Sequence, residues 1–284
     1  MKIRVVSRLL MLSPAPVYCF YRQEFTAMRV YAAFAALCVF IFHFSVPALA
    51  GETSTPAGPD WNKPYVGIAI GAGYGEADHT LGLGGSYFNI QDRAQLDPMG
   101  SRDQSEVMPA ASVFAGINHQ WGNLILGLEG EFTYAPFEKK YDSGRTEYDS
   151  IGGVFFNLRS RVTSEWMASL RPRLGYAFGN SLAYITAGPA LSKFSYRFHF
   201  DDDNLGGNTS TVNKEEFRLG WTAGIGCDYE LENGWAIRTS YQHYEFYDIA
   251  SSAPSFTNGA FQGDLKNSLD YKSDVFLIGI LKTF

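Results

Sequence analysis

Hydrophobic side chains alternate with small or polar ones along eight stretches of this chain. In residues 65–74, Val66, Ile68 and Ile70 fall on one face, whereas Gly67 and Gly71 fall on the other. A repeat of two is that of a β-strand, whose successive side chains point to opposite faces of the sheet. The alternation predicts strands at residues 65–74, 110–120, 124–134, 162–176, 183–196, 217–229, 235–247 and 272–284.

The connections between these strands alternate between short and long. The short ones are tight turns at residues 121–123, 178–181 and 232–234, and the last contains Asn233-Gly234, a strong hairpin signal. The long ones are polar, at residues 78–108, 136–161, 197–215 and 250–271. Outer-membrane barrels have short periplasmic turns and longer external loops. We therefore expect an all-β membrane fold, an eight-stranded antiparallel up-and-down transmembrane β-barrel with short periplasmic turns and long external loops.

A soluble β-sandwich or lipocalin-like barrel is the alternative, because periodicity alone does not distinguish the inside of a barrel from its outside. The face opposite the aliphatic residues favours the membrane barrel. It holds charged residues and many glycines, which suit a narrow lumen better than a solvent-exposed surface. These glycines are Gly67, Gly71, Gly73, Gly127, Gly220, Gly224 and Gly226.

The beginning of the chain has the features of an export signal. Arg29 precedes an apolar run of eleven residues, 32–42, which is too short for a transmembrane helix of about 20 residues. Ala48 and Ala50 form an A-x-A cleavage site. We expect a signal peptide at residues 28–50, a linker at 51–63 and the barrel at 64–284. Residues 1–27 are interpreted as an upstream extension from a misplaced start codon, the alternative being an extended signal peptide.

Charge and cysteine content narrow the class of protein further. Residues 1–50 hold five of the 23 basic and one of the 29 acidic residues, so the remainder carries a formal charge of −10. An acidic body disfavours nucleic acid as a partner. Cys19 and Cys38 lie in the expected leader, which leaves Cys227 alone and predicts no internal disulfide.

The last predicted strand contains the expected membrane assembly signal. Phe276, Ile278 and Ile280 recur at every second residue and lead to Phe284. We expect this apolar face to meet lipid, the barrel assembly machinery to recognise it, and the strand to pair with residues 65–74 and close the barrel. Lys282 interrupts the apolar alternation, and its long side chain could reach the membrane interface.

A group of charged residues is predicted to face the lumen by strand parity. Its members are Glu129, Glu131, Arg171, Arg173, Arg218, Asp228 and Arg238. One interpretation is a catalytic carboxylate pair or an ion path. The favoured interpretation is an ion-pair network that fills the lumen, because eight strands enclose a space just wide enough for side chains. A buried charge left unpaired would cost about 3–5 kcal/mol.

Other chemically suggestive residues give weaker patterns. Ser240 and His243 differ by three positions, which places them on opposite faces of a strand, so no catalytic residues are expected. Residues 201–203 are three consecutive aspartates without the spaced ligands of a calcium loop, so no metal site is expected. His79, His119 and His199 leave heme ligation open as an alternative, although no cofactor is expected.

Four motifs carry a resemblance to a known family. They are RPRLGYAFGNSLAY at 171–184, GWTAGIG at 220–226, ENGW at 232–235 and AGINHQW at 115–121. The chain resembles the small eight-stranded outer-membrane barrels of alphaproteobacteria, which include surface antigens and hemin-binding proteins. It departs from the family pattern at Lys282, where an aromatic residue is usual, and at Ser240, where an acidic residue is common.

The resemblance implies location in the outer membrane and a non-enzymatic role. The expected function is structural, in envelope integrity and in surface interaction through the loops. Binding of heme or another small ligand, or a narrow pore, is the first alternative, and a lipid A-modifying enzyme is the second. The expected partners are outer-membrane lipid and lipopolysaccharide, the barrel assembly machinery and a host or surface ligand.

Overall fold

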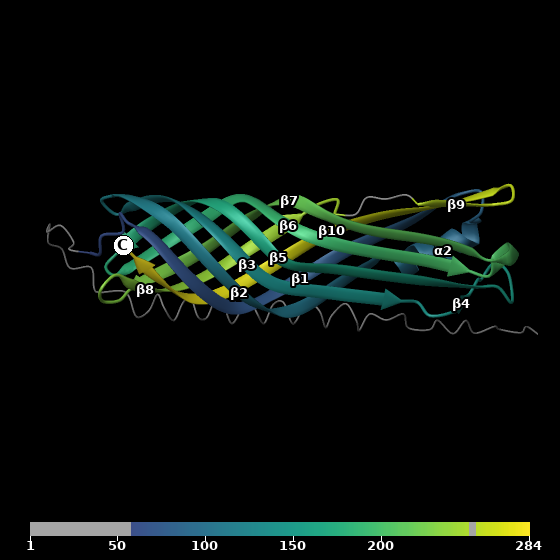
Figure 1. The fold of residues 1–284 in the computed structure, drawn as a ribbon, viewed down its shortest axis with the longest axis horizontal. Coiled ribbons are helices and arrows are strands. Elements are labelled where there is room, and N and C mark those ends of the chain that lie inside the picture. The colour runs from purple at the N-terminus through teal and green to yellow at the C-terminus, as the bar shows by residue number, and fades with distance from the viewer. Residues whose placement is uncertain (1–57, 250–253) are drawn as a thin grey trace, which may run out of the picture. The chain divides into compact units, whose positions relative to one another are not determined.

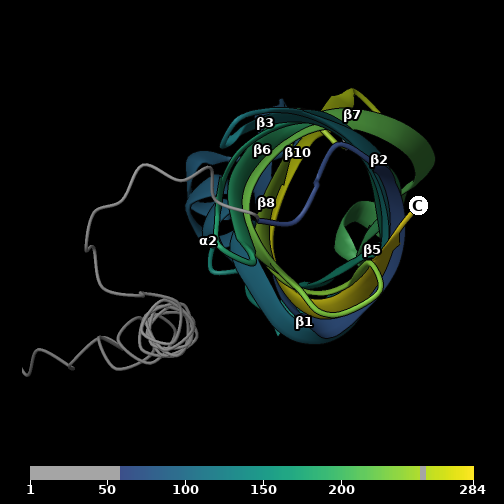
Figure 2. The same ribbon diagram turned by 90° about the vertical axis from the view of Figure 1, so that its left-hand side faces the viewer.

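Eight long antiparallel strands close into a ring in the computed structural model, which describes residues 58–249 and 254–284 (Figures 1 and 2). The strands are β1 (Pro64–Gly85), β2 (Arg102–Trp121), β3 (Leu124–Asp142), β5 (Phe155–Phe178), β6 (Ser181–Asp202), β7 (Asn208–Glu230), β8 (Trp235–Phe246) and β10 (Phe261–Thr283). Each pairs with the next in this order, and β10 pairs with β1 from Tyr65↔Thr283 to Gly85↔Gly263. The predicted all-β barrel and its closure by the last strand are therefore confirmed.

Several sequence-based assignments lie outside the described residues. They are the extension at 1–27, the signal peptide at 28–50 with Ala48 and Ala50, and the linker up to residue 57. The described end of that linker contacts the barrel. Trp61 is buried, and its backbone N–H donates to Oε1 of Gln120 on β2 at 2.8 Å.

The three short turns join strands at the end of the barrel where the C-terminus lies (Figure 1). Each contains a glycine in the left-handed region: Gly122 at φ 59°, Gly179 at 54° and Gly234 at 72°. A side chain at such a position would strain the backbone, so glycine allows the short connections that keep adjacent strands in register.

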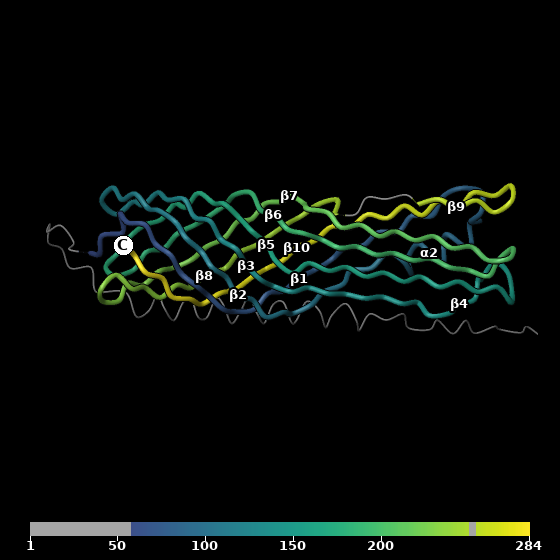
Figure 3. The backbone as a smooth tube through the Cα atoms, in the orientation of Figure 1, coloured from purple at the N-terminus to yellow at the C-terminus, as the bar shows by residue number. Residues whose placement is uncertain are grey.

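The long-loop predictions were wrong in extent. β1 continues eleven residues past Tyr74 to Gly85, and each expected loop is in large part strand instead (Figure 1); the path of the chain is traced in Figure 3. The cause is a reversal of polarity along the strand. Between residues 76 and 83, Ala77 and Leu81 are buried inside, while Glu76 and Asp78 face outward. The period of two persists, but the apolar face now points into the barrel.

The connections at the far end contain small additional elements. These are α2 (Ile90–Gly100), β4 (Thr146–Glu147), the 3-10 turn Asn204–Gly206 and β9 (Ser255–Asn258). Asn89 caps α2 by accepting hydrogen bonds from the backbone N–H groups of Gln91 and Asp92. Within the described part of the chain, no helix combines the length and the apolar character that a membrane crossing requires.

The two halves of the barrel have opposite exteriors. In the half with the short turns, large apolar side chains stand exposed, for example Ile70 at 72% and Leu219 at 76%. Such a continuous apolar surface fits lipid. In the other half the interior is apolar, and Phe137, Phe194, Phe246 and Tyr271 pack with ring centroids 5.1–6.4 Å apart. We call these the membrane half and the external half.

The ladder is interrupted at two places where both neighbouring strands contain a proline. The β2–β3 register ends at Ala111↔Tyr134, so continuing it would bring Pro109 opposite Pro136. The β5–β6 register has a gap between Ser169↔Ala190 and Arg173↔Thr186, which contains Pro172 and Pro189. Proline lacks the N–H that the ladder needs, which explains both interruptions. Pro189 thus lies at a local break of the β5–β6 ladder.

Candidate functional site: a charge network across the lumen

Six charged side chains meet inside the membrane half. Glu129 and Glu131 extend from β3, Arg171 and Arg173 from β5, Asp228 from β7 and Arg238 from β8. All six are buried, with at most 7% of the residue exposed. Strand parity accounts for this placement, because the register pairs Glu129 with Arg171 and Asp228 with Arg238 on adjacent strands.

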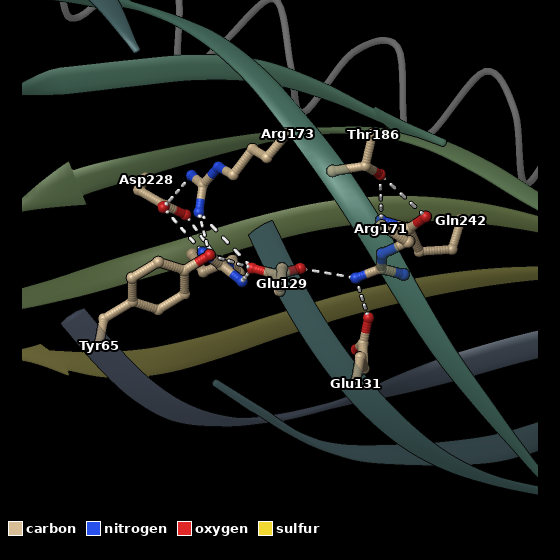
Figure 4. Close-up of polar contacts among 9 residues, drawn as sticks. Tyr65, Glu129, Glu131, Arg171, Arg173, Thr186, Asp228 and Gln242 are labelled. Atoms are coloured by element: carbon tan, nitrogen blue, oxygen red, sulfur yellow. Dashed lines mark hydrogen bonds and ion pairs between the residues drawn. The ribbon is translucent and has the colours of Figure 1, made fainter. Parts of the chain in front are cut away.

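Every member of this lumen network is ion-paired (Figure 4). Arg171 donates from Nη2 to Oε1 of Glu129 at 2.6 Å and also contacts Glu131. Arg238 binds Asp228 through two parallel hydrogen bonds, Nε to Oδ1 at 2.8 Å and Nη2 to Oδ2 at 2.9 Å. Asp228 also accepts from Arg173. Bidentate guanidinium–carboxylate pairs fix geometry as well as charge.

One ion pair joins opposite walls of the barrel. Arg238 Nη1 donates to Glu129 Oε2 at 2.5 Å. Their strands, β8 and β3, are four steps apart in the ring of eight, so they lie across its diameter. The pair therefore spans the full width of the lumen at this level.

The network is electrically balanced. Three arginines face three carboxylates, so their formal charges cancel. Balance matters here because a buried ion lacking a partner is penalised by several kcal/mol, whereas a fully paired set can be accommodated. The arrangement is consistent with a filled interior and places no free charge along an axial path.

Three aromatic residues complete the layer, and sequence reasoning did not assign them to it. Tyr65 on β1 donates to Glu129 Oε2 at 2.7 Å and accepts from Arg173 Nη1 at 2.9 Å. The Arg173 guanidinium lies 3.5 Å from the ring centroid of Tyr184, and that of Arg238 lies 4.1 Å from that of Phe114. The sequence indicates that these three side chains face inward, but it does not indicate that they lie at the same level along the barrel axis as the charged residues.

Arg218 was wrongly included in the network. It shares the inward parity of Asp228 but lies ten residues away on the same strand, about 33 Å at the rise of a β-strand. Its partner is Glu216, and its side chain is 30% exposed. Parity determines the face of a strand and gives no information on height, which is why this prediction failed.

The histidines lie apart from one another. His79 is buried in the external half, where Nδ1 lies 2.6 Å from Gly100 O and Nε2 lies 3.1 Å from Asn267 Oδ1. Burial lowers the pKa of His79 below its usual value. His199 instead contacts Thr211 at 2.8 Å, and His119 packs on Trp121. The geometry does not assemble them into a heme-binding set.

The aspartate run and the Ser240–His243 pair are likewise divided. Asp201 pairs with Arg159, Asp202 accepts from Tyr87 and Tyr148, and Asp203 pairs with Arg145. Ser240 is buried inside the barrel, whereas His243 contacts Asp274. Among residues 58–249 and 254–284, no group of three or more His, Cys, Asp or Glu side chains is arranged to hold a metal ion.

The last strand presents its expected face to the exterior. Ile278 and Ile280 are 44% and 41% exposed, and Phe276 shares their parity. The backbone N–H of Phe284 donates to Pro64 O at 3.0 Å, which ties the last residue to the start of β1. Lys282 reaches the carbonyl of Asn233, with its Nζ 5.4 Å from the ring centroid of Trp235.

Comparison with known proteins gives a consistent set of relatives. Residues 36–284 match the family described as outer membrane protein beta-barrel domain. The 31 kDa outer-membrane immunogenic protein of Brucella melitensis is 29% identical over 210 residues, covering 70% of this chain and 80% of the relative. The 22 kDa outer membrane protein of Rhizobium leguminosarum is 26% identical over 227 residues, covering 76% and 80%. OprG from Pseudomonas aeruginosa aligns with a TM-score of 0.40 at 11% identity, covering 78% and 96%.

Proposed function

The chain belongs to the outer membrane protein beta-barrel domain family and is located in the outer membrane, and on that premise we propose that it is a closed structural barrel. Its membrane half anchors it in lipid without an ion path. Its external half, held above the bilayer, contributes to envelope integrity and to contact with the surroundings. The Brucella relative is named an immunogenic protein, which supports exposure of this half at the cell surface.

The cross-lumen ion pair carries the proposal. Arg238 and Glu129 bridge β8 and β3 at 2.5 Å, and both residues are at most 2% exposed. A hydrated ion passing this level would have to separate the pair and leave both charges without compensation. That separation would cost about 3–5 kcal/mol before the ion's own dehydration is counted.

A second barrier lies above the network. The aromatic cluster of Phe137, Phe194, Phe246 and Tyr271 fills the adjacent section of the lumen with apolar side chains, all at most 1% exposed. An apolar layer of this kind opposes water and ions even if the charged layer rearranges. The charged layer opposes ion passage through ion pairing, and the aromatic layer opposes it by excluding water. A single substitution would therefore not open the barrel.

Conductance in planar lipid bilayers tests the proposal. The folded wild-type protein should give no steady channels at moderate voltage. A variant carrying Arg238→Ala, Glu129→Ala, Phe194→Ala and Phe246→Ala removes the cross-lumen ion pair and two of the four aromatic rings, and serves as the opened control. Steady channels from the wild type would refute the closed-barrel function, provided that a gel-mobility assay shows the inserted protein to be folded.

A further inference from the structure

A row of positive charges crosses three neighbouring strands on the outside of the external half. The register places Lys140 of β3 opposite Arg161 of β5, and Arg161 opposite Arg197 of β6. Like charges directly opposite one another on a sheet destabilise it. Repulsion between these cations therefore destabilises the sheet in the isolated protein, and a bound anion would relieve that repulsion.

The cations of this row are incompletely neutralised. Glu138 pairs with both Lys140 and Arg161, so one carboxylate serves two positive charges. Arg197 has no ion-pair partner within the described residues, whereas Arg161 has only the carboxylate that it shares with Lys140. Guanidinium groups with unused donors are suited to phosphate, which accepts several parallel hydrogen bonds.

The row also has room for a ligand. Arg161 and Arg197 line two adjoining clefts on the barrel exterior, of about 600 and 250 Å³. The larger cleft is further lined by Lys140, Arg159 and His199. Together the clefts provide space on both sides of the Arg161–Arg197 pair.

The height of the row indicates what surrounds it. Lys193 of β6 is the register partner of Phe217, which is 63% exposed at the upper edge of the apolar surface. Arg197 lies four positions beyond Lys193, which is about 13 Å along the strand and about 10 Å along the membrane normal for a usual tilt. The headgroup region adds about 5–7 Å to each side of the hydrocarbon core, so Arg197 lies at the outer margin of the headgroups and well above the acyl chains.

We propose that the Arg161–Arg197 clefts bind the phosphate groups of an outer-leaflet glycolipid. The glycolipid would replace the missing counter-charge and fix the barrel laterally in its leaflet. The inference rests on the proposed structural function, because it names the partner through which the barrel contributes to envelope integrity.

A second copy of the chain is the competing occupant. Across the ring, Asp103, Asp78 and Asp270 form a matching row of negative charges on β2, β1 and β10. Barrels in one membrane share orientation, so the acidic row of one copy could meet the basic row of another. The glycolipid is favoured because it surrounds every copy at this height, whereas contact between copies requires association first.

Titration calorimetry of the folded, detergent-solubilised barrel with bis-phosphorylated lipid A tests the proposal. Removing one charge near an anionic lipid surface should weaken binding about five-fold, so Arg197→Gln should show about that loss and Arg161→Gln/Arg197→Gln about 25-fold. Arg145→Gln is the matched control, since Arg145 is an exposed arginine paired with Asp203 away from the clefts. It should change affinity less than two-fold.

Further measurements distinguish the glycolipid from a free anion and from a second copy of the chain as the occupant of the clefts. Dephosphorylated lipid A should bind wild type and Arg197→Gln equally. Inorganic phosphate that competes at similar affinity would overturn the glycolipid in favour of a free-anion site. Unchanged lipid A binding by the double variant would also overturn the proposal. Chemical cross-linking in the membrane tests the second copy as occupant. If Arg197→Gln and Asp78→Asn both lose cross-linked dimers but keep lipid A binding, the clefts bind another copy of the chain and the proposal is overturned. Conductance is independent of all these outcomes, so failure here and failure of the closed-barrel function are separable.

Discussion

Replacing Glu129 by glutamine should destabilise the barrel more than any single exposed charge change. Glu129 accepts from Arg171 and Arg238 and from the Tyr65 hydroxyl. Glutamine keeps nearly the same volume, so the substitution changes charge without opening a cavity. It leaves three buried guanidinium groups facing only Glu131 and Asp228.

The size of the effect follows from burial. Arg171, Arg173 and Arg238 are at most 2% exposed, so solvent does not replace the lost carboxylate. Nε and Nη1 of Arg171 already lack hydrogen-bond partners among the described residues, which leaves Glu131 as its remaining anion. Removing one partner from a buried ion pair lowers the free energy of unfolding by about 3–5 kcal/mol. We expect a loss in this range.

Reversible urea unfolding in lipid vesicles, followed by tryptophan fluorescence and gel mobility, measures the change. Glu215→Gln is the control: Glu215 pairs with Lys193 at 3.0 Å, but its side chain is 52% exposed, so less than about 1 kcal/mol should be lost. Adding Arg238→Gln to Glu129→Gln restores neutrality and should recover about 1–2 kcal/mol through coupling. A loss for Glu129→Gln no larger than the control's would mean that water reaches the network, and the closed-lumen reasoning would fail.

Three further predictions concern the barrel as a whole, its last strand and its external half. Unboiled protein in detergent should migrate differently from boiled protein on a gel, and identical migration would contradict the closed barrel. Deleting Phe284 should lower the membrane yield of folded protein because its N–H bonds Pro64 O, whereas Lys282→Tyr should match or exceed wild type; normal yield of the deletion would remove the assembly role of this residue. His79 has a lowered folded-state pKa because it is buried, so the unfolded state binds its proton first as pH falls below about 6.5. Stability should therefore be full above that pH and decline below it. His79→Gln should flatten this decline in pH-dependent urea unfolding, and an unchanged pH profile would exclude His79 as its source.

The sequence predicted the membrane half of the barrel well because two simple constraints act there. Lipid outside and a narrow lumen inside impose a strict two-residue alternation, and short turns require residues such as Gly122 and Gly234. The external half obeys the same period with reversed polarity, as at Ala77 and Leu81, and was therefore interpreted as loop. A search for a constant outward apolar face does not detect such a reversal.

The charged site was predictable in membership but not in arrangement. Parity alone identifies Glu129, Arg171 and Arg238 as inward-facing, because each lies on an alternating strand. Parity also wrongly placed Arg218 in the lumen network, although it lies about 33 Å along the strand from Asp228. Parity gave no reason to include Tyr65, which hydrogen-bonds Glu129.

The sequence by itself thus determined the class of fold, the strand order and the face of each side chain in the membrane half, because these depend on local periodicity and turn chemistry. Only the tertiary structure decided which inward charges share a level and which outward charges face one another. Those relations depend on register between strands distant in the chain, as for Arg238 with Glu129 across the ring and Arg161 with Arg197 on its exterior. Register is a property of the closed sheet, and no single strand contains it.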